Sequence, residues 1–276
     1  SRVFLQGSLS FTGNLNTFLS VLYEGGQIVT SDFFRCRSWL QLISDYKVNV
    51  LYLVPSKLRL LLRACKKDVS SVSMVFTGSQ LLDKEDLRCL QRCFPQARII
   101  LYYGASELNY ITYAECLDPD RDPRNLGQPF PEVKLYIKDN VIYIDTKYHV
   151  TGLKMPHTVN DTGYLNEKGE LIFQGRRQNW VNKGGFKISC TKIELLLRRI
   201  SGVKDAAVLP YKDSLRGAEL AAFIVMEKGM NKSYVRKFIQ SSFNPVEVPG
   251  KICFLEKIPL NDRGKLDKAA LQSILS

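Results

Sequence analysis

The chain has 276 residues, of which 45% are apolar and 24% charged, and a formal net charge of +12. This length and an ordinary glycine and proline content indicate a globular protein with room for two domains, which excludes a disordered or fibrous chain. No apolar run approaches the roughly 20 residues that cross a bilayer, and the first residues lack a signal-peptide pattern, so we expect no transmembrane segment.

Strand and helix patterns alternate through the first hundred residues. Residues 48–54 form the clearest strand, because a run that is apolar throughout is typical of a strand covered on both faces. Further strands are expected at 3–9, 27–30, 72–76 and 97–103, and helices in a segment ending near Tyr23 and at 36–46, 55–64 and 83–94. Short connections between alternating strands and helices predict a mostly parallel sheet with helices on its faces.

Two strand ends carry glycine where such sheets bind ligands, in the crevice beyond the carboxyl ends of the strands. Thr77-Gly78-Ser79 follows one expected strand, and Gly104-Ala105-Ser106-Glu107 follows Tyr102 and Tyr103 of another. Because glycine lets the backbone approach a ligand closely, these two ends predict a binding site.

Residues 109–173 change to short strands with proline-rich and acidic loops, which predicts a small β-rich lobe. Strands at 133–137 and 141–144 flank Lys138-Asp139-Asn140, a hairpin signal. A second hairpin is expected after Asp161, with its tip at 167–169 and its returning strand at 171–173.

The chain then breaks at residues 175–178, where glycine and charge separate two apolar runs. Such a break is typical of an interdomain connection, although a surface hairpin with a basic linker has the same local pattern. After it we expect a helix at 189–200, strands at 206–209, 220–226 and 252–255, and helices at 232–241 and 266–275. The sequence therefore predicts an α/β domain over 1–175 and a small α+β domain over 176–276.

The positive charge is concentrated in the second domain. Residues 176–276 contain 19 Lys and Arg against 9 Asp and Glu, so they carry +10 and the first 175 residues +2. This asymmetry indicates an anionic partner, either nucleic acid or a phosphate-rich small molecule such as a nucleotide or coenzyme A, or else a solvated basic face. The basic residues are dispersed and form no reader motif, so we expect no nucleic acid.

The seven cysteines are scattered without a CxxC pair, and the chain has two histidines. An odd number and irregular spacing argue against a disulfide framework and against a zinc site. We therefore expect reduced cysteines and a cytoplasmic protein.

With these elements placed, a series of segments resembles the motifs of the adenylate-forming superfamily, which includes acyl- and aryl-CoA synthetases, peptide-synthetase adenylation domains and luciferases. The match runs through the whole chain in the family's order. The segments are Gly78-Ser79 for the GGE segment, Tyr103–Glu107 (YGASE) for YGxTE, 125–131 (NLGQPFP) for GxxGxPxPG, Asp161 for the acid of TGD, 175–178 (GRRQ) for GRxD, 184–188 (GGFKI) for GGFKV, and 259–267 around Lys265 for PxTxxGKxxR.

Three positions depart from the family's pattern. Ser106 replaces threonine, Val159-Asn160 replaces the first two residues of TGD, and Gln178 stands where the family has Asp or Lys at its hinge. The Ser/Thr/Gly-rich phosphate loop, which lies upstream in the family, has no counterpart. The resemblance therefore implies a C-terminal portion of such a protein, inactive by itself.

The resemblance implies a ligase that joins a carboxylic acid to a thiol through an acyl-adenylate, using ATP and Mg²⁺. The thiol belongs to coenzyme A or to the phosphopantetheine of a carrier protein. Phe11-Thr12-Gly13-Asn14 lacks the aspartate with which amino-acid-activating members hold the substrate amine, which favours a fatty or aryl acid.

The resemblance also assigns roles to single residues. Glu107 would bind Mg²⁺, for which a carboxylate oxygen is a suitable ligand, and Ser106 would hydrogen-bond the α-phosphate. Gly78 and Ser79 would line the adenine pocket with Gly104. Tyr102 or Tyr103 would stack on adenine, although ordinary packing explains either tyrosine as well.

Residues at and beyond the break have roles that the resemblance implies in the same way. Asp161 would accept hydrogen bonds from both ribose hydroxyls, and Arg176 would contact ribose or phosphate. Lys265 would bridge the carboxylate and the α-phosphate when the second domain closes, and rotation near residue 178 would exchange it for the thiol-channel segment. That segment contains Gly184, Gly185 and Lys187.

Two other classes of function compete with the ligase. A non-catalytic member of the fold would hold nucleotide, acyl chain or carrier protein without adenylation, which the departures at Gln178 and Val159-Asn160 leave open. A nucleic-acid binder built on the basic domain would instead show salt-sensitive binding to any duplex.

Overall fold

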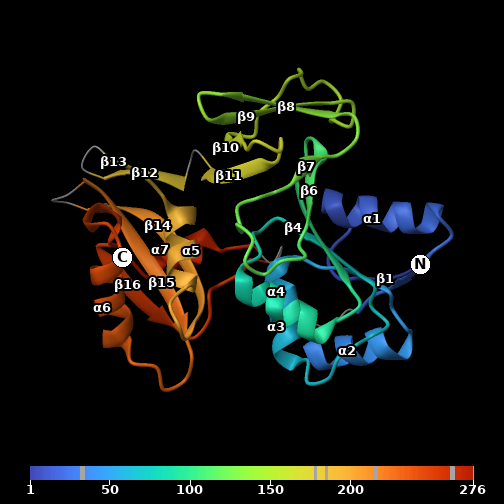
Figure 1. Ribbon diagram of the computed structural model, residues 1–276, viewed down its shortest axis with the longest axis horizontal. Helices are drawn as coiled ribbons and strands as arrows, with labels where there is room; N and C mark the ends of the chain where they lie inside the picture. Colours follow the sequence, from blue (N-terminus) through green and yellow to red (C-terminus); the bar gives the residue numbers. More distant parts are fainter. Residues whose placement is uncertain (32–34, 177–178, 184–185, 214–216, 262–264, 276) are drawn as a thin grey trace. The chain divides into compact units, whose positions relative to one another are not determined.

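Two compact units make up the computed structural model, which describes residues 1–31, 35–176, 179–183, 186–213, 217–261 and 265–275 (Figure 1). The larger unit comprises residues 1–159 and 163–173, and the smaller unit comprises residues 160–162 and 174–276. No helix in these described ranges is long and apolar enough to cross a membrane.

The larger unit is built on a seven-stranded sheet with the order β2-β1-β3-β4-β5-β6-β7. The first five strands are parallel, as predicted, and the last two are antiparallel. The strands are β1 (Arg2–Leu5), β2 (Gln27–Val29), β3 (Val50–Tyr52), β4 (Met74–Gly78), β5 (Arg98–Ala105), β6 (Asn109–Glu115) and β7 (Gln128–Pro129). Because the order of the parallel strands is 2-1-3-4-5, the sheet is doubly wound and has its switch point between β1 and β3.

Helices cover both faces of this sheet. They are α1 (Thr12–Tyr23), α2 (Cys36–Asp45), α3 (Pro55–Ala64) and α4 (Lys84–Cys93). Side chains of α2, α3 and α4 pack with Leu51, Val75 and Leu101 in one core, whereas α1 packs on the opposite face with the alternate strand residues Tyr52 and Tyr102. The two faces carry different residues because successive side chains of a strand point to opposite sides of the sheet.

Two expected strands are shorter than predicted. The strand expected at 48–54 is confined to β3, because the Val48 N–H donates to the Ile43 carbonyl (2.9 Å) and so belongs to the end of α2. The strand expected at 3–9 ends at Leu5, since Gly7 has φ +143° and leaves the extended conformation.

The β-rich lobe is a four-stranded sheet with the order β11-β10-β9-β8. Its strands are β8 (Val133–Lys138), β9 (Val141–Thr146), β10 (Asp161–Leu165) and β11 (Leu171–Arg176). Asp139 and Asn140 have φ of +51° and +60°, so they form the tight turn that the sequence predicted between β8 and β9.

The smaller unit contains a three-stranded sheet with the order β14-β15-β16 and a two-stranded ribbon, β12-β13. Alternate residues of β15 face opposite ways: Leu220 and Ala222 pack with α5 and α6, whereas Ala221 and Phe223 pack with α7. The elements are β12 (Trp180–Lys183), β13 (Phe186–Ser189), α5 (Cys190–Arg198), β14 (Val203–Asp213), β15 (Gly217–Met226), α6 (Lys232–Ser242), the 3₁₀ helix η2 (Pro245–Glu247), β16 (Lys251–Leu255) and α7 (Lys268–Ser273).

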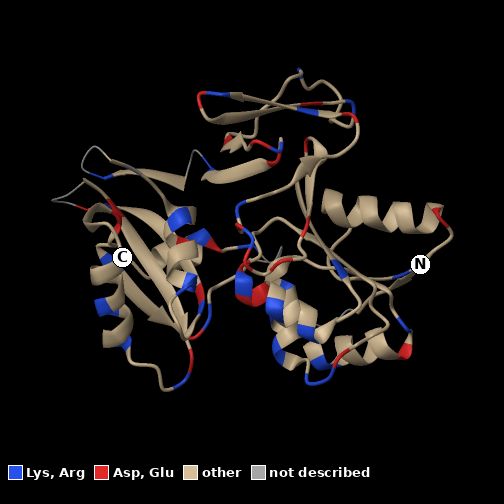
Figure 2. Ribbon diagram, viewed as in Figure 1, with Lys and Arg blue, Asp and Glu red and all other residues tan. Residues whose placement is uncertain are grey.

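Lysine and arginine lie along the exposed side of α6 in this unit (Figure 2). Lys232, Arg236 and Lys237 are exposed, and the first two lie over the Phe254 ring. The basic excess expected for residues 176–276 therefore includes solvated side chains, and its anionic partner stays a prediction.

Candidate functional site

The two glycine-bearing strand ends singled out in the sequence lie side by side. Gly78 is the last residue of β4 and pairs with Tyr102 of β5. A Cβ atom on Gly78 would lie 2.5 Å from the Tyr102 carbonyl oxygen and 2.6 Å from its ring, so a side chain does not fit there. Ser79 follows with φ +72°, which turns the chain away from the sheet.

Ser106 and Glu107 occupy the turn between β5 and β6, and both are exposed. Gly104 sits at a register shift in this hairpin, where a Cβ atom would lie 2.5 Å from the Asn109 carbonyl oxygen. The Val150 N–H donates to the Glu107 carbonyl (2.9 Å) and anchors the turn to the β-rich lobe. The carboxylate and the hydroxyl are thus presented to solvent at the carboxyl edge of the parallel strands.

The two tyrosines before this turn differ in environment. Tyr102 is 9% exposed, stacks on Phe76 with ring centroids 4.7 Å apart, and shares a 2.7 Å hydroxyl hydrogen bond with Tyr52. Burial raises the pKa of Tyr102 to about 12. Tyr103 is half-buried with its ring 6.3 Å from that of Phe173. Tyr102 thus packs among neighbouring rings while Tyr103 is more accessible, and stacking on adenine stays a prediction for both tyrosines.

Asp161 and Arg176 lie together in the smaller unit. Asp161 is 2% exposed, and its Oδ1 accepts a hydrogen bond from Arg176 Nε at 3.2 Å. Thr162 Oγ1 donates to the Gly175 carbonyl at 2.8 Å, which ties the start of β10 to the end of β11. The Arg176 side chain is 62% exposed, so its remaining donors face solvent. This pair combines a buried carboxylate with an exposed cation, and contact with ribose or phosphate stays a prediction for both residues.

Lys265 is exposed in the smaller unit, next to residues 262–264, which lie outside the described part. The Asn261 N–H donates to the Lys265 carbonyl (2.8 Å), and Lys265 N–H donates to Asn261 Oδ1 (3.1 Å). An isolated bridge joins Leu260 to Leu266, and Asp267 then caps α7. Lys265 is thus held through its backbone by Asn261.

The predicted thiol-channel segment is described only in part. The backbone of Lys187 pairs with Asn182 in the β12-β13 ribbon. Gly184 and Gly185 lie outside the described residues, as does the expected hinge residue Gln178. Their roles stay predictions.

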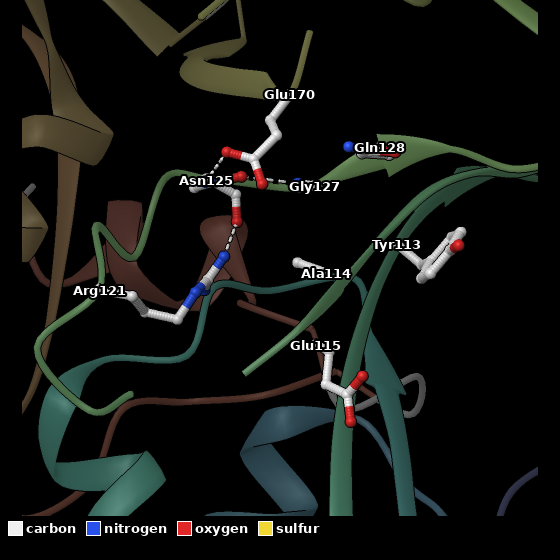
Figure 3. Close-up of a pocket in the computed structure, with 8 residues that line it drawn as sticks. All are labelled: Tyr113, Ala114, Glu115, Arg121, Asn125, Gly127, Gln128 and Glu170. Atoms are coloured by element: carbon white, nitrogen blue, oxygen red, sulfur yellow. Dashed lines mark hydrogen bonds between the residues drawn. The ribbon is translucent and has the colours of Figure 1, made fainter. Parts of the chain in front are cut away.

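A polar pocket of about 270 Å³ lies beside β6 and β7 in the larger unit (Figure 3). Arg121 Nη2 donates to the Asn125 carbonyl, whereas its buried Nη1 has no hydrogen-bond partner in the part that the structure describes. Glu170 accepts from Asn125 and from Asn166, and these hydrogen bonds lower the pKa of its carboxyl group. The lining residues are Tyr113, Ala114, Glu115, Arg121, Asn125, Gly127, Gln128 and Glu170.

This pocket is separate from the predicted catalytic residues, none of which lines it. Only Asn125, Gly127 and Gln128 belong to a motif that the sequence singled out, the 125–131 loop. A Cβ atom on Gly127 would lie 1.9 Å from the Tyr113 carbonyl oxygen, so this glycine serves the packing of the loop against β6. Arg121 and Glu170 were missed because they lie far apart in the sequence and are brought together only by their shared contacts with Asn125.

Magnesium has one suitable ligand at the strand ends. Among the described residues, no group of three His, Cys, Asp or Glu side chains could hold a metal ion. Mg²⁺ needs no such group when it is held by one carboxylate, substrate phosphates and water. The exposed, single carboxylate of Glu107 fits that mode.

Two family models match this sequence. Residues 1–147 match the model of the AMP-binding enzyme family, and residues 192–265 match that of the AMP-binding enzyme C-terminal domain. An uncharacterized acyl–CoA ligase of Bacillus subtilis, YhfT, is 25% identical over 294 residues, which cover 99% of this chain and 60% of the relative. The chain thus spans about 60% of that relative's length.

Solved structures share the fold. The amide bond synthetase McbA of Marinactinospora thermotolerans has a TM-score of 0.87 at 20% identity, covering 100% of this chain and 62% of its own. The O-succinylbenzoate coenzyme A synthetase of Bacillus subtilis, solved with ATP and magnesium, has a TM-score of 0.81 at 18% identity, covering 99% and 61%. The chain belongs to the AMP-binding enzyme family.

Proposed function

We propose that the protein is an acid–thiol ligase that works through an acyl-adenylate. A carboxylate oxygen attacks the α-phosphorus of ATP, the bond to the β-phosphate oxygen breaks, and pyrophosphate leaves. A thiol then attacks the acyl carbonyl, AMP leaves, and the thiol proton passes to solvent. The observation that carries this proposal is the pairing of the two strand ends: Gly78 lies beside Tyr102, and β5 continues from there to the turn in which Ser106 and Glu107 are exposed.

Residues of the larger unit bind and orient the nucleotide. The Ser106 hydroxyl would donate to an α-phosphate oxygen, and Glu107 would hold Mg²⁺, which would neutralise phosphate charge when bound. Gly78, Ser79 and Gly104 let the backbone lie close to adenine, on which Tyr103 stacks. Phosphoryl chemistry depends mainly on positioning, which these residues would supply.

Residues of the smaller unit also have roles in the reaction. Asp161 accepts from the ribose hydroxyls, and Arg176 adds a charge-assisted contact. Lys265, a flexible point charge, bridges the carboxylate and the α-phosphate in one closed state. Gly184, Gly185 and Lys187 form the thiol channel in a second closed state, reached by rotation about residues 175–178.

The acid lacks an α-amino group, so it belongs to the fatty or aryl class. The first turn of α1 contains no acidic residue that would hold an ammonium group. The thiol is that of coenzyme A or of a carrier protein, either of which suits the basic residues of the smaller unit. Both steps use metabolites of the cytoplasm, where we place the protein.

ATP–pyrophosphate exchange tests the proposal, measured on the full-length gene product with a panel of fatty, aryl and amino acids. We expect exchange with one class of acid, and we expect Lys265→Ala to lower its rate at least about 100-fold, as loss of one electrostatic contact to the transition state does. Lys257→Ala, at an exposed lysine nearby, is the matched control.

If Lys265→Ala catalyses exchange at the wild-type rate, the proposed catalytic role of that lysine is wrong. Silence with every acid while nucleotide still binds would favour the non-catalytic module instead. Residues 1–276 alone should not catalyse exchange, because a phosphate loop has no counterpart in them, and exchange by the purified chain would contradict this expectation.

A further inference from the structure

A buried ion pair joins the β12-β13 ribbon to the three-stranded sheet of the smaller unit. Lys183 is the last residue of β12, and its Nζ lies 3.0 Å from Glu219 Oε1 of β15. The same Nζ donates to the Val248 carbonyl at 2.8 Å. The side chains of Lys183 and Glu219 are only 18% and 1% exposed. The reaction steps proposed for this protein use neither of them.

Glu219 depends on this lysine for its partner. Its Oε2 atom is buried and has no hydrogen bond in the part of the chain that the structure describes. A Cβ atom on Gly250 would lie 2.4 Å from that oxygen, so the carboxylate packs directly against the Gly250 backbone. Taking a carboxylate out of water is costly unless a cation accompanies it. Removal of Lys183 alone would therefore leave an unpaired buried charge.

The pair lies at one end of the ribbon. Val181 and Ile188 pair across the ribbon and are buried in the core that contains α5 and α6. Two residues farther along, Lys183 pairs with Phe186, which is 58% exposed; we call these two residues the tip of the ribbon. Because side chains alternate along a strand, Val181 and Lys183 share one side of the ribbon. Apolar contacts therefore hold the ribbon at Val181, and the ion pair holds its tip.

The second acceptor of Lys183 belongs to a segment that is itself held. Glu247, directly before Val248, pairs with Lys192 of α5, and β16 begins three residues after Val248 beside β15. The Lys183 ammonium thus has one acceptor on the sheet and one on this segment. Because an ammonium group has three donors, two such contacts set the direction of the side chain as well as its distance, which apolar contact does not do.

We propose that Lys183 is a positioning residue for thiol transfer: its ion pair with Glu219 and its hydrogen bond to Val248 hold the tip of the ribbon, and with it the thiol-channel segment. This inference rests on the proposed function, which assigns the channel to Gly184, Gly185 and Lys187. Adenylation uses residues outside the ribbon, so the contacts of Lys183 should matter for the second step alone. Misplacing a group that orients a reactant by about 1 Å can cost about 100-fold in rate.

Measuring the two steps separately on the full-length gene product tests this. ATP–pyrophosphate exchange with acetate, octanoate and benzoate reports adenylation. Acyl transfer to coenzyme A, or to pantetheine, the arm that coenzyme A shares with carrier proteins, reports the thiol step. We expect Lys183→Met to keep the exchange rate within about twofold of wild type and to lower kcat/KM for the thiol at least about 10-fold. Lys192→Met is the matched control, because it removes an exposed ion pair beside Val248 without touching the ribbon, and it should change neither step.

The double variant Lys183→Met with Glu219→Leu separates positioning from stability. Replacing both members of a buried ion pair by apolar residues is often neutral, so this variant should keep a urea midpoint near that of wild type even if Lys183→Met alone does not fold. Its thiol step should remain at least about 10-fold slow, because neither contact of the ammonium is restored. A thiol step that recovers together with the midpoint would show that the pair only stabilises the fold, and would overturn the inference.

Thiol transfer at the wild-type rate in Lys183→Met would also overturn it, as would an equal fall in exchange and in thiol transfer. If the wild-type protein catalyses exchange but acylates neither thiol, the inference fails while adenylation stands. If the wild-type protein catalyses exchange with none of the acids, the proposed function fails and the inference falls with it.

Discussion

Arg59 of α3 fastens the loop that follows Gly78 and Ser79, and its replacement by methionine tests how the site is held. Arg59 Nε and Nη2 donate to the two oxygens of Asp86 at 2.8 and 2.6 Å, and Nη2 also donates to the Leu81 carbonyl at 3.1 Å. The two side chains are only 11% and 9% exposed. Asp86 also accepts from the Asp83 N–H in the capping box of α4.

The expected cost of Arg59→Met is about 3 kcal/mol of unfolding free energy. Removing one partner of a buried ion pair typically costs about 3–5 kcal/mol, because the remaining charge is left desolvated. The low end applies, since Asp86 keeps its capping hydrogen bond. For a unit of this size the loss corresponds to a fall in Tm of roughly 6–12 °C.

Tryptophan fluorescence can report the larger unit alone. The chain has two tryptophans, and Trp180→Phe leaves Trp39, which is fully buried in the larger unit, as the only reporter. Urea unfolding of Arg59→Met in the Trp180→Phe protein gives the change in unfolding free energy directly. Arg98→Met is the matched control, because Arg98 pairs with Glu115 while 62% exposed, and should be nearly neutral. A loss below about 1 kcal/mol in Arg59→Met would refute the reasoning.

Three further predictions concern the site and its surroundings. Gly104→Ala places a Cβ atom 2.5 Å from a carbonyl oxygen and should cost about 1–3 kcal/mol in the same urea assay, whereas an unchanged midpoint would show that the bulge yields freely. Burial raises the pKa of Tyr52, Tyr102 and Tyr110, so above pH 10 the unfolded chain loses protons that the folded chain keeps, and unfolding free energy should fall as pH rises. Absorbance titration at high pH should then show that Tyr52, Tyr102 and Tyr110 stay un-ionised until unfolding, and ionisation of all 13 tyrosines near pH 10 in the folded protein would contradict this. Burial also raises the pKa of the Cys190 thiol to about 12, and the residue is 1% exposed, so it should resist a disulfide reagent at pH 8 in the native state; labelling at the rate of a free thiol would count against its burial.

Local patterns determined most of the secondary structure. The helix predicted at 55–64 coincides with α3, because proline at its first position and amphipathic spacing act within a few residues. The turn at Asp139-Asn140 follows from residues that tolerate positive φ. The predicted strand ends were less accurate. At residues 48–54 the hydrogen bond from the Val48 N–H to the Ile43 carbonyl ties the first predicted residue to the end of α2 instead of to the sheet.

The sequence by itself also named Gly78 and the Gly104–Glu107 segment as candidate nucleotide residues, and in the structure a Cβ atom at either glycine would meet a neighbouring carbonyl oxygen at 2.5 Å. Only the tertiary structure brought Tyr52 to Tyr102, fifty positions along the chain, and Arg59 to Asp86. The physical reason is that strand order and register set these contacts. A period of two tells which residues share a face of one strand, but not which residue of a neighbouring strand each will meet.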